Sequence, residues 1–230
     1  ISDKNINLAI HRHSSNKFRN FLKNILISLG IKLNKLIYLD DDFYFFNNSQ
    51  IPQFFSKEIS ITILHQLLTK NNDHKTTKLY VTRKNSPFRK IINESDLIDD
   101  LKSNNIEMID TDNMEIDDQI KIFSSAEVVI APTGSALANL VFCKEGTKVL
   151  EIRPQYNFDY ENIFKKRYSD ICDKLNLVYY SLDADPIKAD KIDKNSEKYK
   201  FISSNVINKS NYYKNLLVKK NEFKKLIDQF

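Results

Sequence analysis

Residues 127–142 read EVVIAPTGSALANLVF, an apolar β-strand pattern that passes through one tight turn into a helix pattern. A strand that turns directly into a helix gathers free backbone N–H groups and the positive end of the helix dipole at one point, which suits a phosphate group. The chain has only three glycines in 230 residues, and both Gly134 and Gly146 fall within this unit. The turn therefore predicts an anion site, although the same pattern is also typical of a plain connection in an α/β protein.

Short apolar runs alternate with amphipathic stretches on both sides of this turn. Single helices between strands require crossover connections and a parallel sheet, so residues 73–186 are predicted to form a Rossmann-like domain. Asn93 is expected to cap one helix, with Asp96 three residues later. The predicted strands are 78–83, 106–110, 127–131, 148–152 and 177–182, and the predicted helices are 93–104, 115–125, 135–142 and 159–174.

Residues 1–72 are predicted to form part of a second Rossmann-like domain. The expected elements are a strand over 6–10, a helix over 16–29 that ends at Gly30, and short strands over 36–39 and 43–46 around an acidic turn. The polar run 71–75 is the predicted linker.

The net charge of +5 at pH 7 is concentrated near the C-terminus. Residues 186–230 hold eleven Lys and five acidic residues, so the rest of the chain carries about −1. Arg and aromatic residues do not alternate there as an RNA-binding groove requires, which argues against nucleic acid. Residues 187–230 are predicted to be a Lys-rich helical tail, with a last helix over 212–230, that lies in solvent or touches an anionic membrane.

The remaining composition favours a cytoplasmic protein that binds no structural metal. No run approaches the roughly 18 apolar residues of a membrane-spanning helix. Cys143 and Cys172 have no CxxC partner and no His at zinc-ligand spacing. The start of the chain shows neither an initiator Met nor the apolar core of a signal peptide, and we expect a fragment or a cleaved form.

Charged side chains follow several predicted strands at the carboxyl edge of the sheet, where open α/β sheets bind their ligands. Arg83 ends one strand, Arg89 lies in the loop after it, and Glu151 with Arg153 ends another. Two guanidinium groups suit a diphosphate, and a carboxylate can accept hydrogen bonds from ribose hydroxyls. Together with the turn at 133–135, these residues predict binding of a nucleotide or a nucleotide sugar.

Four ordered motifs resemble glycosyltransferase family 61: LYVTR at 79–83, RKIINE at 89–94, IKIFSSA at 120–126, and APTGSALANLVFCKEGTKVLEIRP at 131–154. The resemblance implies a GT-B architecture of two Rossmann-like domains, the first of them partial here. It also implies inverting hexosyl, pentosyl or N-acetylhexosaminyl transfer from a nucleotide sugar, expected to be UDP-linked, to a glycan or glycoconjugate, without essential Mn²⁺ or another cofactor. The residues that it assigns to nucleotide-sugar binding are Arg83, Arg89, Thr133, Gly134, Ser135, Ala136, Asn139 and Glu151.

The chain departs from the family's turn, which is usually of the Gly-Pro-His-Gly-Ala-Gly-Leu type. Thr133 stands where the His belongs, Ser135 replaces Ala, and Ala136 replaces Gly. The missing imidazole would be a donor or base near the leaving group. A catalytically inactive domain that binds glycan, nucleotide or a protein partner is therefore the alternative. No catalytic base is assigned; candidates in the first domain are His11, His13, Asp40, Asp41 and Asp42.

Two further interpretations compete with this one. Asp40-Asp41-Asp42 follows a predicted strand and resembles the DxD metal site of the other large glycosyltransferase fold, although an acidic turn is the simpler interpretation. An ordinary dinucleotide-binding protein is excluded, since no G-x-G-x-x-G occurs.

Overall fold

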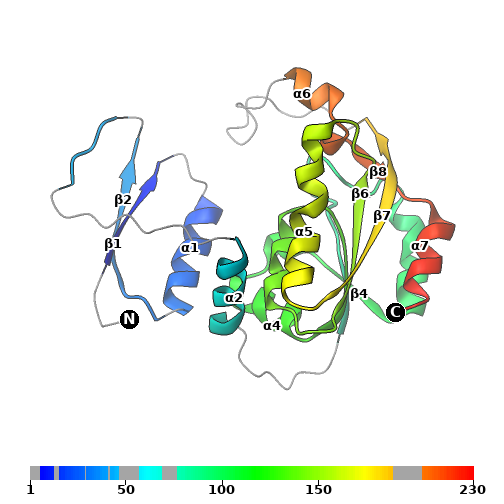
Figure 1. Ribbon diagram of the computed structural model, residues 1–230, viewed down its shortest axis with the longest axis horizontal. Coiled ribbons are helices and arrows are strands. Elements are labelled where there is room, and N and C mark those ends of the chain that lie inside the picture. The colour runs from blue at the N-terminus through cyan, green and yellow to red at the C-terminus, as the bar shows by residue number, and fades with distance from the viewer. Residues whose placement is uncertain are drawn as a thin grey trace. The chain divides into compact units, whose positions relative to one another are not determined.

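The structure, a computed structural model, divides the chain into two compact units, residues 1–70 and 71–230 (Figure 1). It describes residues 6–12, 16–28, 30–40, 42–46, 57–68, 77–188 and 204–230. The predicted linker at 71–75 lies outside these ranges, and the predicted boundaries at residues 72 and 186 stay predictions.

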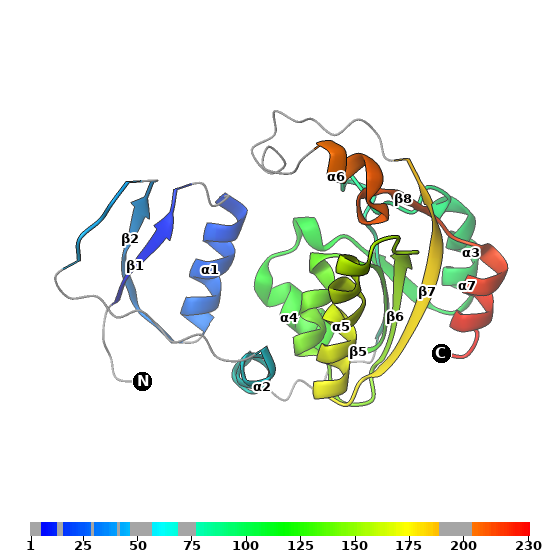
Figure 2. The same cartoon turned by 45° about the horizontal axis from the view of Figure 1, so that its top comes forward.

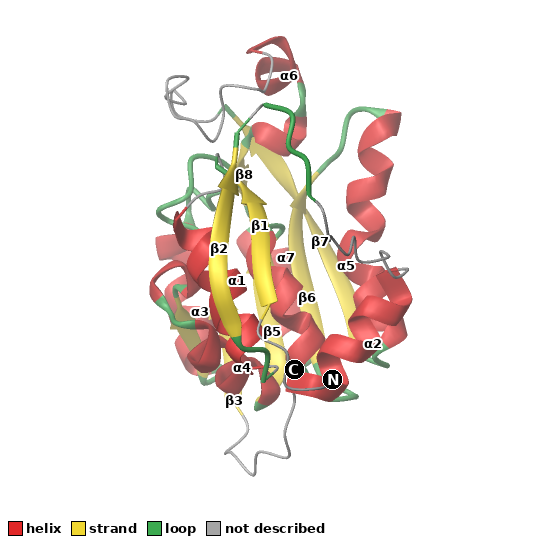
Figure 3. Cartoon of the chain, turned by 90° about the vertical axis from the view of Figure 1, so that its left-hand side faces the viewer, coloured by secondary structure: helices red, strands yellow, loops and turns green. Residues whose placement is uncertain are grey.

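The first unit contains a parallel strand pair joined by a helix. Strand β1 (Ile6–His11) pairs with β2 (Leu33–Leu39), and the two lie side by side in Figure 3. Helix α1 (Asn16–Ser28) connects them, and α2 (Lys57–Leu68) follows. These described elements make one βαβ motif, so the arrangement of two Rossmann-like domains in a GT-B fold stays a prediction.

Two local predictions in the first unit had different outcomes. Gly30 ends α1 as predicted: it has a φ of 71° and donates its N–H to the carbonyl of Ile27 at 2.8 Å, and the N–H of Ile31 reaches Leu26 at 2.9 Å. The strand predicted over 43–46 is wrong, because these residues form a loop and their four aromatic side chains are exposed. β-Branched or aromatic character alone does not make a strand where no neighbouring strand accepts its hydrogen bonds.

The second unit is built on a six-stranded sheet, which confirms the predicted α/β class and the largely parallel sheet. The strand order is β4-β3-β5-β6-β7-β8, and only β8 runs antiparallel to its neighbour. The strands are β3 (Thr77–Val81), β4 (Ile106–Ile109), β5 (Ala126–Pro132), β6 (Lys148–Pro154), β7 (Val178–Ile187) and β8 (Asn215–Leu217).

Helices cover both faces of this sheet, with α4 and α5 on one face and α3 and α7 on the other (Figure 2). The α-helices are α3 (Ile98–Ser103), α4 (Ile116–Ser124), α5 (Asn162–Lys174), α6 (Ser204–Lys209) and α7 (Lys220–Ile227). The 3-10 helices are η1 (Glu94–Leu97), η2 (Thr111–Asn113), η3 (Ser135–Phe142), η4 (Asp159–Glu161) and η5 (Asn211–Tyr213).

The core explains why the central strands read as continuous apolar runs. Alternate residues of β5 point to opposite faces, and both faces are covered, so Val128, Val129 and Ile130 are all buried. The layer toward α3 and α7 includes Leu101 and Phe223. Burial on both faces fixes the sheet, and with it the positions of the loops at its carboxyl edge.

The helix predicted over 135–142 is confirmed as η3. It is a 3-10 helix, whose three-residue repeat brings every third side chain to one face. Leu137, Leu140 and Cys143 follow that repeat, and none of them is exposed. Val141 and Phe142 are buried as well, so the apolar surface of η3 is wider than that repeat.

The predicted helical tail is wrong in the described part of the C-terminal segment. Instead of one helix over 212–230, the chain forms η5, strand β8 and the shorter α7, and residues 71–230 cluster as one unit. β8 joins the sheet by pairing Leu216 with Pro186. Phe223 and Ile227 are fully buried, so apolar burial attaches the segment despite its lysines.

Asn93 does not cap its helix as predicted. Its side chain makes no cap hydrogen bond; it donates to the carbonyl of Val218 at 2.9 Å and accepts from the N–H of Val218 at 3.1 Å. A contact between residues far apart in sequence thus replaces the local one.

None of the described helices combines the length and apolar character needed to cross a membrane. The predicted contact between the Lys-rich segment and an anionic membrane surface stays a prediction.

Candidate functional site

A cavity of about 240 Å³ opens at the carboxyl edge of the second unit's sheet. The loop after β3, the start of η3, helix α5 and helix η5 all contribute to it. Its lining residues are Thr82, Arg83, Ser86, Pro87, Phe88, Arg89, Thr111, Asp112, Ser135, Ala136, Arg167, Tyr168 and Tyr212. The structure therefore brings together Arg83, Arg89, Ser135 and Ala136 of the predicted site.

The guanidinium of Arg83 lies directly against Gly134. A Cβ at Gly134 would stand 2.0 Å from Nη1 and 2.8 Å from Cζ of Arg83, so no larger residue fits while the guanidinium stays in place. The backbone of Gly134 is extended, with a φ of 167°, and any residue can adopt that conformation. Glycine is needed here for the close approach of the arginine. The carbonyl of Gly134 accepts a 2.6 Å hydrogen bond from the hydroxyl of Tyr168.

Arg89 is buried and held on several sides. Its Nε donates to the carbonyl of Thr133 at 2.9 Å, and its Nη1 donates to the carbonyl of Tyr212 at 2.9 Å. The guanidinium carbon lies 4.0 Å from the ring centre of Tyr212 and 4.7 Å from that of Phe88. Arg89 has a φ of 58°, an uncommon backbone conformation for a residue other than glycine. Such conformations persist where surrounding contacts fix them, and they concentrate at functional sites.

Arg167, on α5, is a third cation at the cavity that the sequence prediction missed. Its guanidinium carbon lies 4.8 Å from the ring centre of Phe164, and that ring stacks on Tyr212 at 4.3 Å. On the sequence Arg167 sits in the run Lys165-Lys166-Arg167, which reads as a solvated helix face. Consecutive residues of a helix point in different directions, so the direction that faces the sheet edge is the signal that could have separated Arg167 from its two neighbours.

The charged groups that line the cavity are three arginines and one carboxylate, that of Asp112. Burial, together with the nearby charge of Arg89, lowers the pKa of Arg83 to about 10, and burial lowers the pKa of Arg89. The ion pairs found among the described residues include neither of these arginines. Nε of Arg83 is buried and has no hydrogen-bond partner within the described chain. Charged donors kept in this state suit a polyanionic ligand that would complete their hydrogen bonds.

The turn after β5 places its residues differently. Ser135 and Ala136 line the cavity at the beginning of η3. Thr133 is buried, and its carbonyl accepts the hydrogen bond from Nε of Arg89. Free N–H groups at the start of a helix add to the positive potential there. The turn predicted as an anion cradle thus borders the cavity through its second half.

Asn139 and Glu151, like Thr133 and Gly134 of the predicted site, do not line the cavity. The side-chain amide of Asn139 donates to Gln119 at 2.7 Å. Glu151 is fully buried; its Oε2 accepts from the hydroxyl of Tyr179 at 2.6 Å, and its Oε1 has no partner in the described residues. Burial raises the pKa of the Glu151 carboxyl. In this structure Asn139 therefore bonds to α4 and Glu151 bonds to β7.

The acidic turn of the first unit is described in part. Asp40 accepts a hydrogen bond from the hydroxyl of Tyr44 and lies 3.5 Å from Nη2 of Arg12. The bond from Tyr44 and the charge of Arg12 lower the pKa of Asp40. Asp41 and His13 lie outside the described residues, and His11 is exposed on β1. The assignment of a catalytic base to this unit stays a prediction.

Comparison with known proteins identifies a family. The model of the family described as Glycosyltransferase 61 matches residues 16–150, more than half of the chain. No curated protein matches the chain. The matched range includes Arg83, Arg89 and the turn after β5, and Arg167, Tyr168 and Tyr212 lie beyond it.

Proposed function

The chain belongs to the glycosyltransferase 61 family, and from this premise we propose that the cavity of the second unit binds the diphosphate of a nucleotide-sugar donor. The observation that carries the proposal is the gathering of Arg83, Arg89 and Arg167 around one cavity, two of them without a carboxylate partner among the described ion pairs. The proposed reaction transfers the sugar to a glycan or glycoconjugate acceptor. A UDP-linked donor is proposed, as the sequence resemblance implies.

The guanidinium groups fit the charge of a diphosphate. Arginine presents planar N–H donors that match phosphate oxygens in pairs, and it stays charged at neutral pH. Arg83 keeps a buried Nε without a partner, so binding of an anion would return hydrogen bonds lost when the side chain left water. This gain supports phosphate as the ligand group over an uncharged sugar.

The same groups support catalysis without a metal. In the proposed step, an acceptor hydroxyl attacks the anomeric carbon and the nucleoside diphosphate leaves from the opposite face, which inverts the configuration. Negative charge grows on the phosphate oxygens as the glycosidic bond breaks. Fixed cations in a water-poor cavity stabilise that charge most strongly, which lowers the barrier. Arg83 and Arg89 would carry this part, and the proton of the acceptor passes to a base that we do not assign.

Calorimetric titration with UDP and with pyrophosphate, with and without Mn²⁺, tests the proposal. We expect metal-independent binding by the wild type and loss of at least tenfold in affinity for Arg83→Ala. Arg153→Ala is the matched control, because Arg153 ends β6 at the same edge but pairs with Asp183 at 2.7 Å and does not line the cavity. An unchanged affinity in Arg83→Ala, or binding only with Mn²⁺, would contradict the proposed site.

Turnover separates an active transferase from the inactive alternative. Release of UDP from UDP-sugars, slow in water and faster with an acceptor glycan, is expected of an active enzyme. Tight UDP binding with no release from any sugar nucleotide would favour a domain that keeps the site without the reaction, as the missing imidazole at Thr133 suggests.

A further inference from the structure

A segment near the C-terminus, residues 210–218, lies against two loops that border the cavity. We call this segment the strap. It comprises η5 and β8 and lies beyond the residues matched by the family model. Its attachments, and the position of one tyrosine within it, suggest a role in the site.

On one side the strap is bonded to the loop that carries Arg89. The N–H of Arg89 donates to the carbonyl of Lys214 at 2.8 Å, and the N–H of Leu216 donates to the carbonyl of Lys90 at 2.8 Å. The N–H of Ile92 in turn donates to Leu216 at 2.9 Å. This ladder fixes the backbone of Arg89, and it accounts for how a non-glycine residue holds a φ of 58°.

On its other side the strap is bonded to the segment that leads into α5. The hydroxyl of Ser210 donates to the buried carboxylate of Glu161, which also accepts from the N–H of Asn157 at 3.0 Å. The N–H of Asn211 donates to the side-chain carbonyl of Asn157 at 2.9 Å. Because α5 carries Arg167, the strap connects the surroundings of two cavity arginines.

Tyr212 lies between these two attachments, within a stack of four side chains. Its ring centre is 4.0 Å from the guanidinium carbon of Arg89 and 4.3 Å from the ring centre of Phe164. Phe164 in turn lies 4.8 Å from the guanidinium carbon of Arg167. A cation placed over an aromatic ring is attracted by the ring's electron density, and this attraction is stronger away from water.

We propose that Tyr212 is a positioning residue, which holds the guanidinium groups of Arg89 and Arg167 at the cavity for the phosphates of the donor. This inference rests on the proposed function and names a residue outside the matched family range that serves the same site. Stacking covers one face of the Arg89 guanidinium. The N–H groups at its edge stay available for hydrogen bonds in the plane of the guanidinium. A guanidinium fixed in advance loses less freedom when the anion binds, so affinity rises without any contact between Tyr212 and the phosphate.

The variants that test this role differ in what they remove. Tyr212→Phe keeps the stack, whereas Tyr212→Leu removes the ring. Tyr180→Leu is the matched control, because Tyr180 packs against another ring near the C-terminus, that of Phe230 at 5.1 Å, and does not line the cavity. Phe164→Leu removes a ring of the stack from the side of α5 and changes no residue of the strap. It therefore tests the inference even if Tyr212→Leu fails to fold.

Affinity for pyrophosphate and for UDP is measured by calorimetry, with thermal unfolding of every variant. We expect Tyr212→Phe to stay within threefold of the wild type, and Tyr212→Leu and Phe164→Leu to lose tenfold or more. Tyr180→Leu is expected to lose less than threefold in affinity, even if its melting temperature falls as far as that of Tyr212→Leu. In an Arg89→Ala background, the further loss caused by Tyr212→Leu is expected to shrink, because only Arg167 is left to position.

The outcomes separate this inference from the proposed function. If the wild type binds pyrophosphate and UDP but Tyr212→Leu binds as tightly, the positioning role is overturned and the diphosphate site stands. An undiminished loss from Tyr212→Leu in the Arg89→Ala background also overturns it. If the wild type binds neither probe, the proposed function and this inference both fall.

Discussion

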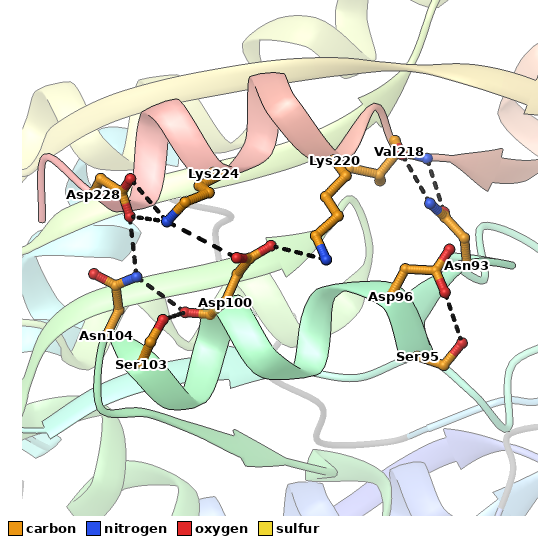
Figure 4. A network of polar contacts seen from close by, with 10 residues as sticks. All are labelled: Asn93, Ser95, Asp96, Asp100, Ser103, Asn104, Val218, Lys220, Lys224 and Asp228. Atoms are coloured by element: carbon orange, nitrogen blue, oxygen red, sulfur yellow. Dashed lines mark hydrogen bonds and ion pairs between the residues drawn. The ribbon is translucent and has the colours of Figure 1, made fainter.

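Two polar regions of the second unit use charge in opposite ways. At the cavity, Arg83 and Arg89 lie near each other, and neither belongs to an ion pair among the described residues. Between α3 and α7, charges of opposite sign face each other (Figure 4). There the carboxylate of Asp100 lies 3.7 Å from Nζ of Lys220 and 3.9 Å from Nζ of Lys224.

The second region serves the fold. Lys224 also contacts Asp228 at 3.1 Å, and Asn104 donates to Asp228 at 3.2 Å, so acidic and basic groups alternate between the two helices. The lysines are about half exposed, and such pairs contribute modestly to stability. The arginines at the cavity are more buried than these lysines, and the charge of Arg89 lowers the pKa of Arg83, so the two guanidinium groups repel each other. The difference indicates that paired charges attach α7, and the arginines without an ion pair are the basis of the anion site that we propose.

Of the changes proposed here, replacement of Arg83 should have the largest effect on ligand affinity. Arg83→Met removes a buried cation and its repulsion with Arg89, so the free energy of unfolding without ligand should stay level or rise by up to about 1 kcal/mol. Affinity for UDP should fall by about 2 kcal/mol, or roughly thirtyfold. Urea unfolding and calorimetry measure the two quantities on the same sample. A clear loss of stability with unchanged affinity would show that Arg83 belongs to the fold instead.

Gly134→Ala should disturb the same cation without removing it. The new Cβ would stand 2.0 Å from Nη1 of Arg83, and the flexible end of that side chain must move away. We expect about a tenfold loss of UDP affinity, near 1.4 kcal/mol, with little change in the melting temperature. Ala138→Ser, at an exposed position of the same 3-10 helix, is the control. Equal affinity in both variants would mean that the Arg83 position does not matter for binding.

Asp100→Asn should give the reverse pattern. It removes the charge that faces Lys220 and Lys224 and keeps the size of the side chain, so the unfolding free energy should fall by about 1 kcal/mol. UDP affinity should not change, because Asp100 lies on α3 away from the cavity lining. Added salt should shrink the stability difference between the variant and the wild type. A fall in UDP affinity would break the distinction between the two regions.

Glu151→Gln should have the smallest effect, visible as a pH dependence. Burial raises the folded-state pKa of Glu151 above its ordinary 4.5, so the folded chain holds this proton to a higher pH than the unfolded chain does. Stability of the wild type relative to Glu151→Gln should therefore fall as the pH rises from about 4.5, and the two should converge below it. Urea unfolding at several pH values tests this. If the stability of the wild type relative to Glu151→Gln rose with pH instead, the fold would favour the charged form of Glu151.

Much of the sheet and half of the site could be predicted from sequence. The apolar runs at β3, β5 and β6 identify buried parallel strands, and residues just after such strands must meet at one edge. Arg83 and Arg89 were found in this way. Glu151 shows the limit of the rule: it is in β6 itself, paired with Ala131 and Ser181, and it is buried because both faces of that strand are covered.

The C-terminal segment was predicted least well. Local patterns favoured a helix over 212–230, yet Leu216 is fully buried within β8 and pairs with Pro186 on β7. Strand pairing depends on a neighbour about thirty residues away, which no local propensity contains. Asn93 failed as a cap for the same reason, since Val218 competes for its side chain.

By itself the sequence determined the parallel sheet and the family of the chain, because burial on both faces of a strand and ordered motifs are both recorded in consecutive residues. Only the tertiary structure decided which cations share one cavity. Arg167 and Tyr212 reach it from segments about 80 and 120 residues away from Arg89, through contacts that no local pattern encodes. Side-chain direction and burial, which assign Glu151 to the interior and Arg83 to the cavity, are likewise products of packing around the sheet.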